Sequence, residues 1–292
     1  MKSRFVSAMV ITGLLLLFSG VGICQDKVSM SDWVEKVNQG SVNWSAGYIE
    51  AVGIGAPADK SIGKANARPM ALRAAKIDAL RNLLEITKGV QVDSTTTIKD
   101  FTVESDVINT QVNGLVKGAV VVDQQYMSDG TVEVKLRMPL YGNLAQIIIP
   151  LAIEKRKDLT PPEAPAAPAP ATPAPAAPPA AYTGMVVDAR GIQARPAMSP
   201  RVLDEDGNEV YGSANVDREF AVQQGMSGYA RDLNAAQSNQ RVTNNPATIK
   251  AIKTSGAGKA DLIISNADAR QIKASAENAS FMKKCRVMIV LD

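Results

Sequence analysis

The chain has 292 residues, of which 46% are hydrophobic, and a formal net charge of +3. It contains no histidine, so it lacks the side chain that most often transfers protons near neutral pH and the imidazole ligands of most zinc and copper sites. Residues 25–158 carry 16 basic and 16 acidic side chains and residues 182–292 carry 14 and 12, so neither part has the basic excess of a nucleic-acid-binding protein.

The first 24 residues have the organisation of a secretory signal. Two basic residues precede an apolar run from Phe5 to about Phe18, and small residues follow it. We therefore predict a signal peptide over residues 1–24 and export to the periplasm or outer membrane. A retained membrane helix is the alternative, because the run approaches the length of a span. Cys24 is either removed with the signal or lipidated as the first mature residue of a lipoprotein, an outcome that Ile23 disfavours.

Residues 25–158 form the first predicted domain, and it opens with a short helix and a strand. Ser31 and Gly40 are suited to cap and end a helix over residues 31–40, and residues 43–55 have the composition of a strand. Residues 66–89 then place apolar side chains on one helical face and charged ones on the other. Alanines 75 and 79 on the apolar face predict that this helix lies close against a sheet.

The sheet is predicted to follow the helix directly. Strands are expected at residues 89–98, 114–127 and 131–140, with a short helix at residues 103–112. The last strand alternates apolar and charged residues, which indicates one buried and one solvent-facing surface. The first domain is therefore expected to be an α+β unit with helices on an antiparallel sheet.

Three segments of this domain also carry a family resemblance. They read "AVGIG", "ARPMALRAAKIDALRNLLEITKGVQV" and "VNGLVKGAVVVDQQYMSDGTVEVKLRMPLYG". Together they span about residues 45–142, which resemble the Lpp-twenty-type outer-membrane lipoproteins and the N-terminal domain of flagellar assembly protein T. The resemblance implies a non-catalytic envelope protein in an outer-membrane or flagellar setting. The residue before Cys24 and the long second domain depart from that pattern.

A proline- and alanine-rich linker separates two predicted domains. Residues 160–181 contain 9 of the 16 prolines and 10 alanines, and we place the linker at residues 159–181. Such a segment favours extended polyproline II, which could hold the domains up to roughly 70 Å apart at about 3.1 Å per residue.

Residues 182–292 form a second predicted α+β domain, also with helices on an antiparallel sheet. Strands are expected at residues 182–191, 260–265 and 285–291, and two extended segments fold about a turn at residues 204–208. Helices are expected at residues 228–237 and 244–256, and residues 266–282 are helical or a loop. The role of this domain stays open.

The sequence contains no convincing catalytic constellation, cofactor motif or metal motif. Asp188 with Arg190 is the best binding-site candidate, although a structural ion pair is favoured. The acidic turn after Asp204 lacks the spacing of an EF-hand. The glycines at 53 and 55 match the glycine spacing of a dinucleotide-binding loop, but they are better explained by a strand that bends over the helix. Cys285 is expected to be a buried, inert thiol.

The leading hypothesis is a non-enzymatic envelope protein that serves as a structural or adaptor component, in association with envelope or flagellar basal-body proteins or with itself. Any membrane attachment would be through a lipid on Cys24, and no cofactor is expected. A module that binds a glycan or small ligand is the first alternative, and a carboxylate-dependent hydrolase is the second.

Overall fold

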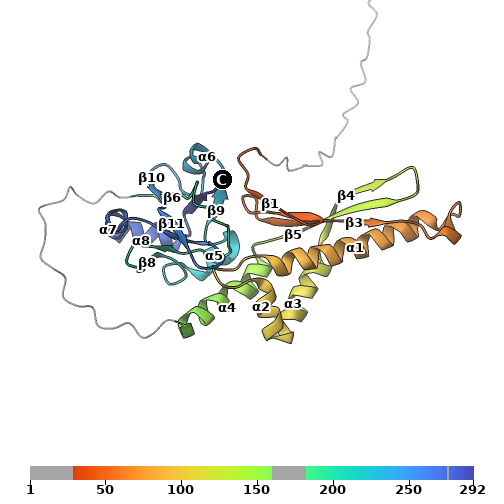
Figure 1. Ribbon diagram of the computed structural model, residues 1–292, viewed down its shortest axis with the longest axis horizontal. Coiled ribbons are helices and arrows are strands. Elements are labelled where there is room, and N and C mark those ends of the chain that lie inside the picture. The colour runs from red at the N-terminus through yellow and green to blue at the C-terminus, as the bar shows by residue number, and fades with distance from the viewer. Residues whose placement is uncertain (1–28, 160–181, 275) are drawn as a thin grey trace, which may run out of the picture.

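The computed structural model describes residues 29–159, 182–274 and 276–292, which form two α+β domains (Figure 1). The predicted fold class is confirmed. The predicted signal peptide, Cys24 and nearly all of the predicted linker lie outside the described residues. Within the described ranges, no helix combines the length and the apolar character needed to cross a membrane.

The first domain is built on a five-stranded antiparallel sheet with the order β1-β2-β3-β5-β4. Its strands are β1 (Val34–Val37), β2 (Gly40–Asn43), β3 (Tyr48–Gly55), β4 (Val120–Tyr126) and β5 (Val132–Pro139). Along β5, four buried apolar side chains alternate with three charged ones, as predicted. The buried face is covered by α1 (Ala67–Gly89), which follows β3 through the short 3-10 helix η1 (Asp59–Ser61).

Helix α1 packs unusually close to β3. Ala71, Ala75 and Ala79 are completely buried on the helix face that meets the strand. Opposite them, a Cβ atom added to Gly53 would lie 2.1 Å from the backbone nitrogen of Ala79, and one added to Gly55 would lie 2.2 Å from the carbonyl oxygen of Ala71. The predicted close packing of an alanine-rich helix on a sheet is confirmed, and the two glycines make it sterically feasible.

The predicted helix over residues 31–40 is wrong, because this segment forms β1 and its turn into β2. The backbone nitrogen of Trp33 donates to Ser45 Oγ at 2.7 Å. The carbonyl of Ser31 accepts from the backbone nitrogen of Arg231 in the second domain. Pairing with β2 and contact with the other domain therefore outweigh the local helix signals.

The predicted strand over residues 89–98 is also wrong. This segment is a loop with one isolated bridge between Gln91 and Thr97. It leads into α2 (Ile98–Glu104), which starts with a capping box in which the Thr97 nitrogen donates to Asp100 Oδ2 at 2.7 Å. Helix α3 (Asp106–Lys117) confirms the predicted short helix but runs farther than expected. Strand β4 consequently begins only at Val120.

Helix α4 (Asn143–Leu159) was not predicted and contains Pro150 in its interior. Proline removes one backbone donor from a helix and is normally a stop signal. Burial of apolar side chains on both sides of Pro150, including Ile148, Ile149 and Ala152, stabilises the helix despite the missing bond.

The second domain contains two four-stranded sheets. The first has the order β10-β6-β13-β9 and comprises β6 (Gly184–Asp188), β9 (Gly228–Ala230), β10 (Pro246–Lys250) and β13 (Val287–Val290). The second has the order β11-β12-β7-β8 and comprises β7 (Val202–Leu203), β8 (Glu209–Tyr211), β11 (Lys253–Ser255) and β12 (Asp261–Ile263). The connecting helices are α5 (Arg218–Gln224), α6 (Leu233–Gln237), α7 (Asn266–Lys273) and α8 (Ala276–Lys283).

The expected antiparallel arrangement is wrong for this domain. The second sheet is mixed, because β12 pairs with β7 in parallel, and all three strand pairs of the first sheet are parallel. Its central strands β6 and β13 are almost continuous runs of buried apolar residues, without the alternation of a half-exposed sheet. Such runs are typical of parallel strands that are covered on both faces.

The predicted helix over residues 244–256 is wrong as well, since this segment forms β10 and β11. Thr248 and Ile249 are β-branched, and burial alternates along β10 as in a strand. Pro246 is the first residue of this edge strand, a position where no backbone donor is required. The predicted helix over residues 228–237 is half correct: β9 precedes α6, whose cap is Asp232.

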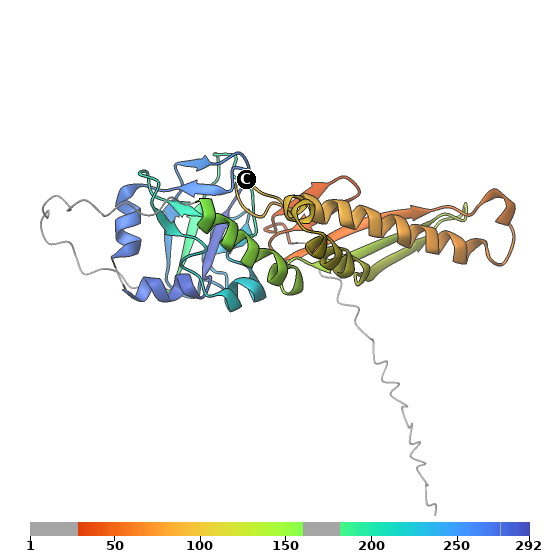
Figure 2. The same ribbon diagram turned by 90° about the horizontal axis from the view of Figure 1, so that it is seen from below.

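The two domains pack directly against each other (Figure 2). Ser45 Oγ donates to the carbonyl oxygen of Tyr229 at 2.6 Å, and Arg195 forms a 2.6 Å ion pair with Glu35. The carbonyl oxygens of Gln91, Val92 and Ser94 accept backbone hydrogen bonds from the second domain. One hydrophobic cluster also contains residues of both domains. The expectation that the linker holds two separate bodies apart is therefore wrong.

Candidate functional site between the domains

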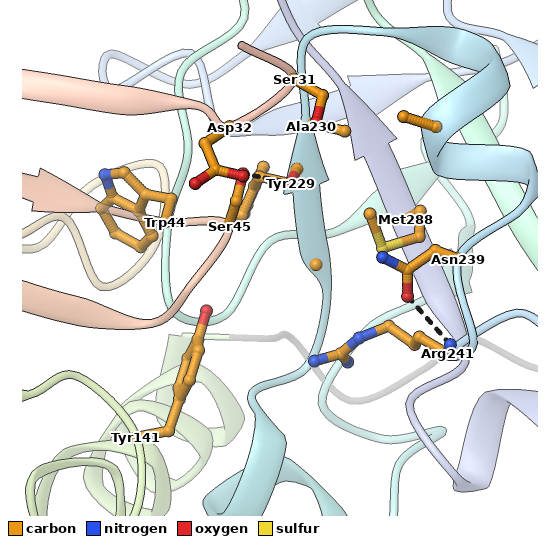
Figure 3. A pocket seen from close by; sticks show the side chains of 12 residues that line it. Ser31, Asp32, Trp44, Ser45, Tyr141, Tyr229, Ala230, Asn239, Arg241 and Met288 are labelled. Carbon is orange, nitrogen blue, oxygen red and sulfur yellow. Dashed lines mark hydrogen bonds between the residues drawn. The ribbon is translucent and has the colours of Figure 1, made fainter. Parts of the chain in front are cut away.

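A cavity of about 340 Å³ lies where the domains meet (Figure 3). The first domain contributes residues next to β1, β2 and α4, and the second contributes β9, β13 and the region of α6. The lining residues are Ser31, Asp32, Trp44, Ser45, Tyr141, Gly228, Tyr229, Ala230, Ala235, Asn239, Arg241 and Met288.

Among the described residues, Arg241 is the only arginine or lysine that lines this cavity. Its Nη1 donates to the carbonyl oxygens of Cys285 at 2.8 Å and Gly225 at 3.1 Å, and its Nη2 donates to that of Gln224. No carboxylate of the described residues forms an ion pair with it. A guanidinium stays protonated in proteins, so the cavity holds a positive charge whose hydrogen-bond partners among the described residues are backbone carbonyls.

Gly228 gives Arg241 room beside the sheet. A Cβ atom at this position of β9 would lie 2.4 Å from Met288 Sδ and 3.1 Å from Arg241 Nε. A larger residue would therefore push the guanidinium or Met288 into the cavity.

Tyr141 is held between the domains by two glycines. A Cβ atom at Gly47 would lie 2.7 Å from the Tyr141 ring and one at Gly225 would lie 2.4 Å from it, and both glycines have positive φ angles of 72° and 80°. The phenol extends from the start of α4 into the cavity (Figure 3). Burial raises the pKa of Tyr141 to about 12, partly opposed by Arg241. Its hydroxyl is therefore a neutral donor near pH 7, and it has no hydrogen-bond partner among the described residues.

The rings of Trp44 and Tyr229 form an apolar wall. Their centroids are 5.6 Å apart at an interplanar angle of 73°, an edge-to-face arrangement. Their polar atoms are occupied elsewhere: Trp44 Nε1 donates to Glu35 at 3.2 Å, and the Tyr229 hydroxyl donates to the carbonyl of Ala197 at 2.7 Å.

Asp32 supplies a negative charge on the side of the cavity opposite Arg241 (Figure 3). Its Oδ2 accepts from Asn43 Nδ2 at 3.3 Å and from the backbone nitrogen of Ser29 at 3.2 Å. No basic side chain in the described part of the chain forms an ion pair with it. The cavity thus combines one cation, one anion, a phenol donor and an aromatic wall.

The predicted candidates Asp188 and Arg190 lie elsewhere. Arg190 Nε and Nη2 donate to the two carboxylate oxygens of Asp188 at 2.8 and 2.7 Å, which is a bidentate ion pair in the turn after β6. The hydrogen bond from Arg190 is the main reason that the pKa of Asp188 is lowered. Arg190 borders a broad surface depression with Lys250 and Asp268 and does not reach the interdomain cavity. The predicted ion pair between the two residues is therefore present in the structure.

Two other sequence candidates also have structural roles. Asp204 accepts from the backbone nitrogens of Asp206 at 3.1 Å and Asn208 at 2.8 Å, which confirms a turn at the acidic segment. Cys285 is completely buried, as predicted, and burial raises the pKa of its thiol to about 11. Among the residues with described positions, no group of three or more histidine, cysteine or acidic side chains could hold a metal.

Sequence reasoning missed the interdomain cavity entirely. Its principal residues, Trp44, Tyr141, Tyr229 and Arg241, are scattered over about 200 positions and form no motif. The available signal was compositional, because the chain has only 2 tryptophans and 6 tyrosines. One tryptophan and two tyrosines meet at this cavity.

Residues 184–292 match the family model described as Treponema pallidum Tp0624, second domain. The match begins at the first residue of β6 and runs to the end of the chain, so it coincides with the second domain. No curated protein matches the chain. Residues 184–292 are therefore similar to the second domain of that protein, and the match gives no information on function.

Proposed function

We propose that the protein is a non-catalytic structural or adaptor component of the bacterial cell envelope that docks a partner through the edge strand β4. The proposal rests on one observation above all: β4 ends the first sheet, and its backbone has no neighbouring strand on the outer side among the described residues. Three consecutive valines on it, Val120, Val121 and Val122, are 59%, 44% and 39% exposed.

An edge of this kind is suited to strand addition. Natural edge strands are often blocked by lysine, proline or a covering segment, because unpaired backbone groups attract other chains. The sequence of β4 is VVVDQQY, which contains neither lysine nor proline. Its register shifts between Val121 and Asp123, and Val122 at this shift is still 39% exposed. An extended segment of a partner could therefore add its backbone to β4 and cover the valines.

The chemistry of the described residues supports a role in docking and not in turnover. The best carboxylate candidate, Asp188, is paired with Arg190, and the chain has no histidine to act as a general base. The envelope setting follows from the predicted signal peptide and the family resemblance of the first domain. The partner is accordingly a protein of the outer membrane or of the flagellar basal body, or a second copy of this chain.

The edge can be tested with the double substitution Val120→Lys and Val122→Lys. Two lysines on the edge should oppose strand addition by requiring that charges be buried, and we expect at least tenfold less partner recovered by crosslinking and co-purification from envelope fractions. Sedimentation of the purified parent protein and of the double variant measures whether self-association is lost as well.

The matched control is Val107→Lys on α3, where the side chain is 65% exposed and lies away from the edge. Surface substitutions of this kind change stability little, so both variants should unfold at the temperature of the parent protein. Equal recovery of the same partners by the double variant and the control would refute docking through β4.

A further inference from the structure

We propose that the interdomain cavity binds a small zwitterion, an amino acid or short peptide, with its carboxylate on Arg241 and its ammonium group near Asp32. The volume of about 340 Å³ lies within the range of known small-molecule pockets, roughly 300–1,000 Å³. This binding site is independent of the docking edge at β4.

The donors left on Arg241 select a carboxylate. A guanidinium has five N–H donors, and Arg241 uses three of them on the carbonyls of Gln224, Gly225 and Cys285. The two that remain are the Nε–H and one Nη2–H, and these nitrogens lie on one edge of the guanidinium plane. That edge can form the parallel pair of hydrogen bonds that carboxylates accept from arginine.

Tyr141 supplies a further donor without rearrangement. Its ring is fixed between Gly47 and Gly225, and its hydroxyl is directed into the cavity. No described group accepts from or donates to this hydroxyl, so it is available to donate to a ligand oxygen. Burial keeps this phenol protonated over the whole physiological range, since its pKa is about 12.

Asp32 makes a zwitterion a better fit than a simple anion. Its carboxylate lies across the cavity from the guanidinium and has no ion pair among the described residues (Figure 3). It would repel a multiply charged anion such as phosphate and attract an ammonium group. Trp44 and Tyr229 also line the cavity, but they are only 1% and 2% exposed, so they shape its wall and favour a ligand with a small side chain.

Ligand binding can be followed by tryptophan fluorescence, because Trp44 lines the cavity and is one of only two tryptophans. In a Trp33→Phe background, the emission of Trp44 can be followed as the dipeptide Ala-Ala, N-acetylalanine, alaninamide or inorganic phosphate is added to the purified chain. We expect a saturable change with Ala-Ala. N-acetylalanine lacks the ammonium group and alaninamide lacks the carboxylate, so each should bind roughly tenfold more weakly, the typical loss of one charge-assisted hydrogen bond.

Tyr141→Phe is the decisive variant. It retains the ring between the two glycines and removes only the hydroxyl, so the fold should be unchanged while the affinity for Ala-Ala falls roughly tenfold. The matched control is Tyr126→Phe on β4, where a tyrosine that is 49% exposed lies outside the cavity and should leave the affinity unchanged. Asp32→Asn should abolish the preference for Ala-Ala over N-acetylalanine.

Three results would overturn the proposal. The first is the absence of any emission change with Ala-Ala up to about 10 mM, a concentration at which a complex with a millimolar Kd would be largely formed. The second is an equal loss of affinity in Tyr141→Phe and Tyr126→Phe. The third is saturable binding of phosphate as tight as that of Ala-Ala, which would indicate a general anion site.

Discussion

Gly53 is the residue at which the packing of the first domain can be tested most directly. Its Cα faces the backbone of α1, and a Cβ atom there would lie 2.1 Å from the Ala79 nitrogen and 2.4 Å from the Ala75 carbonyl oxygen. Neither neighbour is a flexible side chain that could turn away. We expect Gly53→Ala to lower the free energy of unfolding by about 1–3 kcal/mol, the usual cost of overpacking, as measured by urea denaturation.

Gly114→Ala is the matched control for this substitution. Gly114 lies inside α3, and a Cβ atom there would meet nothing within 4 Å. Alanine should stabilise the helix by about 0.5–1 kcal/mol because it restricts the unfolded chain. If both substitutions changed stability equally, the close contact between α1 and β3 would not be the reason that position 53 requires glycine.

At the same scale, the sequence predicted some residue roles and could not predict others. The alanines of α1 repeat at helical spacing within one segment, so their contact with a sheet could be inferred from the pattern alone. The roles of Arg241 and Tyr141 depend on which segments meet in space. Their surroundings come from Gly47, Gly225 and Cys285, which no local pattern connects.

Among the secondary-structure elements, those with complete periodicity were predicted correctly and those governed by distant contacts were not. Helix α1 and strand β5 each bury one regular face, so the period in the sequence identifies them. Pro246 and Gly256 are residue types that often begin and end a helix, but the pairing of β10 with β6 determines the conformation of this strand. Parallel pairing joins segments that are far apart in the chain, and this information is absent from a local window.

Helix α4 supplies the prediction at the scale of an element. Pro150 interrupts its hydrogen bonding, and proline in a helix interior costs about 3 kcal/mol relative to alanine. Alanine also gives the unfolded chain more conformational freedom, which reduces the expected gain in stability by roughly 0.4–1 kcal/mol. We therefore expect Pro150→Ala to raise the free energy of unfolding by about 2–2.6 kcal/mol in chemical denaturation.

Pro246→Ala provides the comparison, because Pro246 begins an edge strand where no donor is missing. This control should not gain stability. A loss of stability in Pro150→Ala would mean that the proline itself is needed for the packing of Ile148 and Ile149 in the core.

For the whole molecule, composition predicted two domains but not their association. The proline-rich segment marks a boundary, and the contacts that join the domains come from isolated side chains such as Ser45, Ser94 and Arg195. Ser94 illustrates this, because its Oγ accepts from the backbone nitrogen of Asp261 at 2.8 Å across the interface. An ordinary serine in a loop carries no signal of such a role.

The association of the domains can be tested by cutting the chain between them. With a protease site inserted after Ala171, the cleaved halves should still elute together in size-exclusion chromatography, because buried apolar contacts and the 2.6 Å bond from Ser45 to Tyr229 do not require the linker. Ser45→Glu should separate them, since it places a carboxylate against the Tyr229 carbonyl in a partly buried contact. Separate elution of the unsubstituted halves would show that the linker, and not the interface, holds the domains together.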